Sequence, residues 1–237
     1  MTTTFKKQLP LFLGNCCLQT YMQYENEGDF TIPKGFSLLK SFKANAIGFK
    51  EWFGFIIESK KSVIIAFRGT DSNPDWIVDA EVAQMSFPYT KDENEVHEGF
   101  CSIYESCREE ILDTVDQIPL KKTIYVTGHS LGAALATLCA YDISKHGFNV
   151  SLYNYASPRV GDAKFAKDVH QSLHECFRFV NVYDIVPLLP PESIYSPLTD
   201  QTYSYHHIKD AYTFGIQTDS LAGNHSIYTY LKGVKDF

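Results

Sequence analysis

Short apolar runs alternate along the chain with stretches whose apolar positions recur every three to four residues. The runs are rich in β-branched and aromatic residues, and they predict strands at 53–57, 63–67, 123–127, 149–155, 177–183 and 203–208. The periodic stretches predict helices at 100–118, at 131–143, and after Asp162 and His225. Strands that alternate with helices of this length indicate an α/β fold, with a mostly parallel central sheet and helices on both faces.

Length, composition and charge favour one ordinary globular domain. The 237 residues contain no repeat, low-complexity tract or Gly/Ser linker, so we expect a single domain over 1–237. Lys and Arg number 21 against 28 Asp and Glu, a net charge of −7 with no basic block, which argues against a nucleic-acid partner. No apolar run approaches the roughly 18 residues of a spanning helix, so no transmembrane segment is expected.

The cysteines and the N-terminal residues bear on location. The chain has six cysteines and no C-x-x-C pair, so we expect free thiols in a reducing compartment rather than a disulfide framework or a zinc site. Residues 1–15 lack the cleavage pattern of a secretory signal. We therefore expect a cytoplasmic protein, or a secreted one if a leader preceded Met1.

Residues 128–132, Gly-His-Ser-Leu-Gly, match the pattern G-x-S-x-G. A predicted strand precedes them, and a helix that is apolar or small on every side follows them, so Ser130 falls at a sharp strand-to-helix turn. Such a turn needs glycines two residues on either side of the serine, because neighbouring backbone approaches there. The alternative is a glycine-bracketed serine in an ordinary turn. We expect Ser130 to be a nucleophile at a helix N-terminus, where negative charge is favoured.

A serine hydroxyl is a poor nucleophile without a neutral imidazole to take its proton and a carboxylate to orient that imidazole. With this kind of turn the acid follows a later strand and the histidine comes near the end of the chain. The strand predicted at 177–183 ends on Asp184, and His225 opens the last predicted helix. We expect both residues to act with Ser130, and activity to fall on acidification, because a protonated imidazole cannot serve as the base.

Other carboxylates and histidines have structural explanations. Asp162 is typical of a helix N-cap, and Asp200 lies in a polar turn. His206 and His207 alternate in a predicted strand, so only one of them can face any site. His97 precedes the nucleophile in the chain and is expected to be a hydrogen-bonding structural residue.

His170 and His174 lie four residues apart on a predicted helix, a spacing that can hold a metal ion. No nearby cysteine or carboxylate pair completes a metal site, so we expect surface residues. We expect no metal and no other cofactor.

A tetrahedral intermediate needs donors for its oxyanion, and one of them should be the N–H of Leu131, directly after the nucleophile. The second should come from the loop after an earlier strand. Thr70 follows the strand predicted at 63–67 and could offer both its N–H and its hydroxyl. The alternative is an ordinary turn.

A short helix is expected near 72–80, because Asn73 is a plausible N-cap and Pro74 a good first helical residue. It would be either a mobile lid that turns its apolar side onto the site or toward lipid, or a helix packed permanently on the core. The lid and substrate-binding candidates in it are the apolar residues Trp76, Ile77 and Val78.

Taken together, the motifs resemble those of class 3 lipases, the α/β-hydrolase family that includes the fungal triacylglycerol lipases. The resemblance runs from Val63 to Leu231, and the first sixty residues match only loosely. The motifs that carry it are at 65–70, 75–79, 96–100, 126–134, 157–162, 183–187 and 224–226.

The resemblance implies an α/β-hydrolase fold and the same assignments: Ser130, Asp184 and His225 as the triad, Thr70 and Leu131 as the oxyanion hole, and the Trp76 segment as the lid. It implies a serine carboxylester hydrolase that acts on acylglycerols at a lipid–water interface through an acyl-enzyme. Three alternatives stay open: a soluble short-chain or feruloyl esterase, a phospholipase acting at the sn-1 position, and a catalytically silent lipid-binding or signalling module.

Overall fold

The computed structural model describes residues 8–46, 48–70, 82–208 and 211–235. Its centre is a seven-stranded sheet in the order β1-β2-β3-β6-β7-β8-β11. The first three strands pair antiparallel, and β3, β6, β7, β8 and β11 are mutually parallel. The strands are β1 Ser37–Asn45, β2 Lys50–Glu58, β3 Ser62–Phe67, β6 Thr123–His129, β7 Asn149–Tyr155, β8 Glu175–Asn181 and β11 Ala211–Phe214.

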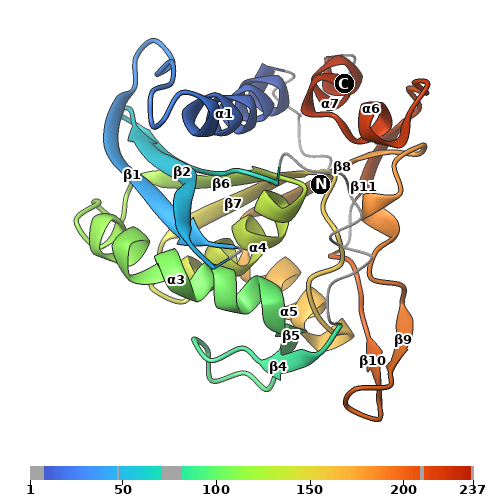
Figure 1. Ribbon diagram of the computed structural model, residues 1–237. Helices are drawn as coiled ribbons and strands as arrows, with labels where there is room; N and C mark the ends of the chain where they lie inside the picture. Colours follow the sequence, from blue (N-terminus) through green and yellow to red (C-terminus); the bar gives the residue numbers. More distant parts are fainter. Residues whose placement is uncertain (1–7, 47, 71–81, 209–210, 236–237) are drawn as a thin grey trace.

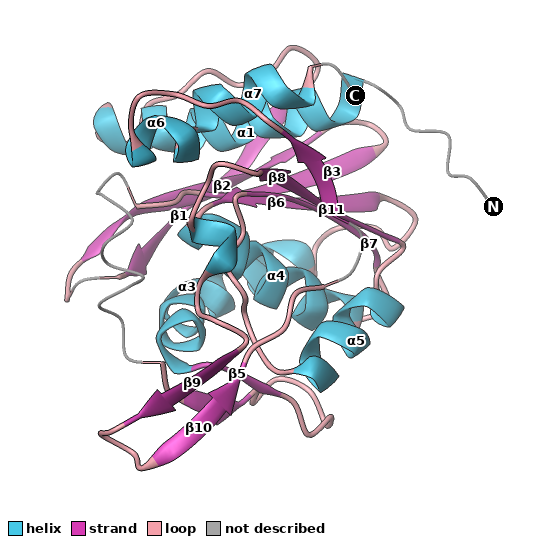
Figure 2. Cartoon of the chain, turned by 90° about the vertical axis from the view of Figure 1, so that its right-hand side faces the viewer, coloured by secondary structure: helices cyan, strands magenta, loops and turns pink. Residues whose placement is uncertain are grey.

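Helices cover both faces of this sheet (Figures 1 and 2), which confirms the expected α/β architecture. On one face lie α3 Glu98–Val115, α4 Leu131–Ser144 and α5 Ala163–Ser172. On the other lie α1 Gln8–Glu25, α6 Leu221–His225 and α7 Ile227–Val234. In the described part of the chain, no helix combines the length and apolar character needed to cross a membrane.

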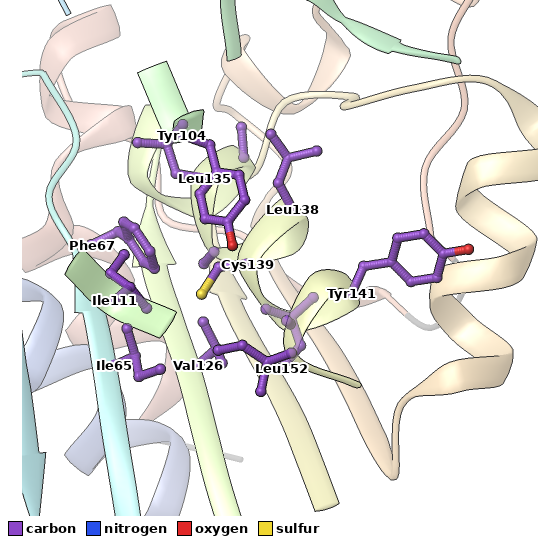
Figure 3. Close-up of a cluster of buried hydrophobic side chains, with 14 of the residues drawn as sticks. Ile65, Phe67, Tyr104, Ile111, Val126, Leu135, Leu138, Cys139, Tyr141 and Leu152 are labelled. Carbon is purple, nitrogen blue, oxygen red and sulfur yellow. The ribbon is translucent and has the colours of Figure 1, made fainter. Parts of the chain in front are cut away.

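The core has two parts, one on each side of the sheet. Figure 3 shows the larger one, a single cluster that contains Val126 and Leu152 of the sheet and side chains of α3 and α4 such as Ile111 and Leu135. Nearly all of α4 is buried, as the apolar sequence at 131–143 predicts, and Gly147, at φ 85°, lies three residues beyond its end. Helices on both faces explain why the central strands β3, β6 and β7 are buried at nearly every position rather than at alternate ones.

Two small hairpins lie outside the central sheet. One pairs β4 Gln84–Ser86 with β5 Glu95–His97, and the other pairs β9 Ser193–Ser196 with β10 Gln201–Ser204. The strand predicted at 203–208 is therefore wrong in its second half: β10 ends at Ser204, and only an isolated bridge from His206 to Gly161 follows. The true edge strand of the sheet is β11.

Candidate active site

The turn from β6 to α4 places Ser130 in a strained conformation, with φ 59° and ψ −126°. Two glycines allow the turn to be this tight. A Cβ atom on Gly128 would lie 2.1 Å from the carbonyl oxygen of Gly132, and one on Gly132 would lie 2.4 Å from that of Phe67. Strain of this kind persists only where the surrounding structure holds it, and it is concentrated at functional sites.

Three side chains from separate parts of the chain form one hydrogen-bonded series. His225 Nε2 lies 2.8 Å from Ser130 Oγ, and His225 Nδ1 lies 2.8 Å from Asp184 Oδ2. Because a carboxylate only accepts, Nδ1 carries the proton, and Nε2 is free to accept the proton of the Ser130 hydroxyl. All three residues are buried. The structure thus brings together the three residues expected to form the site, in the geometry that a nucleophile, a base and an orienting acid require.

Asp184 follows β8 in a tight turn closed by a bond from its N–H to the carbonyl of Asn181. Each of its carboxylate oxygens has a further donor: the N–H of Val186 contacts Oδ1 at 3.0 Å, and the hydroxyl of Tyr230 contacts Oδ2 at 2.7 Å. These bonds hold the carboxylate in one orientation toward His225.

His225 is the last residue of α6 and does not open the final helix, which corrects the expectation from sequence. The N-cap of α7 is Ser226, whose hydroxyl accepts from the N–H of Tyr228. A side chain of β8 fixes the residue before the histidine, because Asn181 Nδ2 donates to the carbonyl of Asn224 at 3.0 Å. The imidazole therefore lies at the break between α6 and α7, and not at the start of the last helix.

His129, inside the nucleophile turn, was not singled out from the sequence. Its Nε2 lies 2.8 Å from the carbonyl oxygen of His225, and its Nδ1 lies 2.7 Å from the hydroxyl of Tyr21 on α1. A carbonyl only accepts, so Nε2 carries the proton and Nδ1 accepts from Tyr21. Complete burial and the neighbouring His225 hold the pKa of His129 well below its ordinary value, so it stays neutral. The signal available in the sequence was a histidine directly before the candidate nucleophile.

The expected oxyanion donors lie beside the nucleophile turn. Leu131 is the first residue of α4, where a backbone N–H has no partner within the helix. The Thr70 hydroxyl is buried and has no hydrogen-bond partner among the described residues. Its neighbour Gly69 packs so closely that an added Cβ would lie 3.0 Å from the Cβ of Ser130. A buried donor without a partner is costly, so Thr70 Oγ1 is suited to bind a group that is absent from the free protein.

Arg68, directly before this loop, is buried and tightly held. Its Nη2 lies 2.7 Å from Glu51 Oε1, and its Nε donates to the carbonyl of Trp52 at 3.0 Å. The guanidinium also stacks on the rings of Tyr24 and Phe53, at 3.9 and 4.7 Å from their centroids. The end of β3 is thereby fixed where it meets the nucleophile turn.

His97 and Asp162 take the structural roles expected of them. His97 is the N-cap of α3 and accepts from the N–H of Gly99, and Asp162 is the N-cap of α5. His206 and His207 do not alternate in a strand, because β10 ends at Ser204. His206 lies 3.0 Å from Ser204 Oγ, and His207 Nε2 donates to the carbonyl of Pro187 at 2.6 Å.

α5 ends at Ser172, so His174 lies beyond the helix and does not share a face with half-buried His170. No group of three or more potential metal ligands occurs in the described residues. The lid candidates Trp76, Ile77 and Val78 fall within 71–81, outside the residues that the structure describes.

Comparisons with known proteins agree with this geometry. The sequence model of the family described as Lipase (class 3) matches residues 64–194, more than half of the chain. A lipase of Rhizomucor miehei is 40% identical over 143 residues, which cover 56% of this chain and 39% of that protein. Phospholipase A1-IIgamma of Arabidopsis thaliana is 28% identical over 87% of this chain and 58% of its own length. The chain thus spans less than two thirds of the curated relatives it matches.

Solved structures extend the match to most of the fold. The triacylglyceride lipase of Rhizomucor miehei superposes with a TM-score of 0.72 at 26% identity, over 90% of this chain and 81% of that one. A mutant of the Penicillium cyclopium protein MDLA superposes with a TM-score of 0.71 at 26% identity, over 93% of this chain and 83% of that one. The family match, the parallel sheet and the serine at its strained turn lead to one conclusion: the chain belongs to the class 3 lipase family.

Proposed function

We propose that the chain is a serine carboxylester hydrolase that cleaves acylglycerols through an acyl-enzyme. The observation that carries this proposal is the unbroken series Ser130 Oγ, His225 Nε2, His225 Nδ1 and Asp184 Oδ2, with 2.8 Å at each contact. It supplies a nucleophile, a base within reach of the proton, and an acid that fixes the base.

In the acylation step, Ser130 Oγ attacks the ester carbonyl carbon while its proton passes to His225 Nε2. The carbonyl oxygen becomes an oxyanion beside the N–H of Leu131 and the hydroxyl of Thr70. When the tetrahedral intermediate collapses, the C–O bond to the alcohol breaks and His225 returns the proton to the leaving oxygen. Asp184 stabilises the imidazolium during this step without taking its proton.

In the deacylation step, water replaces the alcohol. His225 Nε2 accepts a proton from water, the resulting hydroxide attacks the acyl carbon, and Ser130 Oγ leaves with the proton restored to it. Side chains, backbone N–H groups and water carry every step of the proposed cycle.

The substrate is proposed to be an acylglycerol at a lipid–water interface, with the helix expected near 72–80 acting as the lid of a single domain. The names of two relatives support this choice: "Lipase" from Rhizomucor miehei and "Secreted mono- and diacylglycerol lipase A" from Penicillium cyclopium. A second candidate is phospholipase A1 activity, favoured because the match to the Arabidopsis phospholipase covers 87% of the chain. A reducing compartment remains a prediction that rests on six free, buried cysteine thiols.

The test is the initial rate of tributyrin hydrolysis, measured as the concentration passes through the solubility limit, with Ser130→Ala as control. A rate that rises only when droplets form supports a lipase, whereas saturation below that limit indicates a soluble esterase. A phosphatidylcholine substrate labelled at each acyl position tests the phospholipase candidate. If neither ester is cleaved and a fluorophosphonate does not label Ser130, the hydrolase proposal is wrong and a binding role takes its place.

A further inference from the structure

Exposed apolar side chains are concentrated in the segment that carries Asp184. Fourteen large apolar residues are exposed in the described part of the chain, and six of them lie between positions 182 and 198. They are Val182, Tyr183, Ile185, Leu188, Tyr195 and Leu198. Single exposed apolar residues are ordinary, whereas contiguous ones mark a surface that binds something apolar. Six within seventeen consecutive positions make this segment the candidate for such a surface. We name residues 182–198 the docking segment.

Hydrogen bonds to its backbone carbonyls hold the first half of the docking segment in place. The guanidinium of Arg159 donates to the carbonyls of Leu188 and Pro190, and the backbone N–H of Arg159 donates to the carbonyl of Leu189 at 2.8 Å. His207 holds the carbonyl of Pro187 at 2.6 Å. The polar atoms of this loop thus bond inward, while the Leu188 side chain stays 61% exposed.

The second half of the docking segment enters the hairpin of β9 and β10, which stands out from the body of the molecule (Figures 1 and 2). Leu198 lies in the turn that connects β9 to β10 and is 77% exposed, and Tyr195 on β9 is 57% exposed. The Tyr195 hydroxyl donates to Asp200 Oδ1 across the turn. The hairpin therefore presents exposed apolar side chains on a pair of hydrogen-bonded strands.

The charges of the docking segment indicate which apolar partner it fits. The sequence contains no Lys or Arg between positions 179 and 208, and its carboxylates there are Asp184, Glu192 and Asp200. Arg159 reaches the segment from outside, but its side chain is only 12% exposed and lies 3.6 Å from Glu192. Surfaces that bind anionic lipids use clusters of Lys and Arg. This surface instead fits an interface without net charge.

We propose that the docking segment seats the protein on uncharged or zwitterionic lipid interfaces, through Leu188 and Leu198 in particular, and gains nothing from anionic headgroups. This inference rests on the proposed function, since it names the kind of interface at which the ester would be cleaved. Tyr183 and Ile185, both exposed, flank Asp184 in the chain, so the first part of the segment adjoins a member of the catalytic series.

The experiment measures vesicle binding by flotation in the Ser130→Ala protein, so that hydrolysis plays no part. Pure phosphatidylcholine vesicles are compared, at low salt, with vesicles in which a third of the lipid is phosphatidylglycerol. Leu188→Ser and Leu198→Ser should each lower the partition coefficient about tenfold, because an apolar side chain no longer enters the lipid. Leu120→Ser is the matched control: Leu120 is 60% exposed but precedes β6, and its replacement should change nothing.

Two results would overturn the inference: equal binding by the Leu188 and Leu198 variants and the parent protein, or stronger binding to the anionic vesicles. Thermal unfolding midpoints establish that the variants remain folded. The outcome is separable from the proposed function. Loss of binding in the two variants supports docking even if the wild-type protein cleaves no ester. Conversely, ester cleavage with binding insensitive to both leucines leaves the hydrolase proposal standing and removes the docking inference.

Discussion

The hydroxyl of Tyr230 donates a 2.7 Å hydrogen bond to Asp184 Oδ2, the same carboxylate oxygen that lies 2.8 Å from His225 Nδ1. Tyr230 is fully buried in α7, and burial together with the charge of Asp184 raises the pKa of its phenol well above the ordinary value. The phenol therefore remains a donor at any pH at which the fold persists. It withdraws part of the negative charge that would otherwise act on His225 alone.

Replacing Tyr230 by Phe should lower kcat by roughly tenfold, because Asp184 Oδ2 loses one of the donors that hold the carboxylate toward His225. The check is kcat for a water-soluble ester, measured on protein shown to be folded.

Tyr228 provides the control for this experiment, because it lies on the same helix but is 54% exposed. Tyr228→Phe should leave kcat unchanged. A folded Tyr230→Phe protein that keeps the wild-type kcat would show that the phenol does not position Asp184.

Thr70→Val should lower kcat by roughly 10² to 10³ with little change in KM. The Thr70 hydroxyl is buried without a partner among the described residues, and removal of one oxyanion donor costs about this much. Thr70→Ser keeps the hydroxyl and should retain most of the rate. If Thr70→Val turns over substrate normally while folded, the second donor is the backbone N–H alone or lies elsewhere.

Ser130→Ala should reduce kcat by a factor on the order of 10⁶, and Asp184→Asn by about 10⁴. The asparagine amide would donate toward His225 Nδ1 and so favour the tautomer that cannot take the serine proton. Active-site titration with a fluorophosphonate checks both variants, because Ser130→Ala should not be labelled and Asp184→Asn should be labelled slowly. Equal rates for Asp184→Asn and the wild type would remove this carboxylate from the mechanism.

Short runs of β-branched and aromatic residues predicted β3, β6, β7 and β8, four of the five parallel strands, and the G-x-S-x-G motif predicted the nucleophile turn. β3, β6 and β7 are rich in β-branched and aromatic residues and are buried on both faces, and Ser130 lies between glycines that the tight turn requires. The hydrogen bond that joins Ser130 to His225, 95 positions away, could be expected only from the order of the motifs. Its length and the burial around it required the folded chain.

Other elements gave no local signal. α1 contains Pro10 and Gly14, residues that weaken a helix assignment, and it is stabilised by packing on α7, where a Cβ on Gly14 would lie 2.8 Å from Leu231. β11 has four residues with partly exposed alternate positions, and only its pairing with β8 defines it as a strand. The break between α6 and α7 depends on the Ser226 cap. Tertiary contacts, rather than propensity, determine all three.

Tyr21→Phe should lower the free energy of unfolding by about 1 to 3 kcal/mol, because it leaves the buried Nδ1 of His129 without its donor. Urea unfolding at pH 7 measures the change. Tyr24 lies on the same helix and is 38% exposed, so Tyr24→Phe should cost less than about 0.5 kcal/mol. Equal effects from the two substitutions would contradict the contact between α1 and the nucleophile turn.

His97 should make the fold less stable as the medium becomes acidic. Burial lowers its pKa to about 4, and its Nδ1 accepts from the N–H of Gly99, which only the unprotonated nitrogen can do. The unfolded chain takes up the proton near pH 6.5 and the folded chain does not, so stability is complete above that pH. It declines as the pH falls from about 6.5 to 4, by about 3 kcal/mol.

His97→Asn tests this assignment, because asparagine keeps an acceptor at the helix N-cap but does not titrate. The variant should be somewhat less stable than the wild type at pH 7, since it loses the stacked contact of His97 with Phe100. Its free energy of unfolding should nevertheless fall less steeply between pH 6.5 and 4. His129 and His207, also held neutral by burial, remain in both proteins and retain part of the slope. Parallel curves for the two proteins would mean that His97 is protonated without penalty in the folded state.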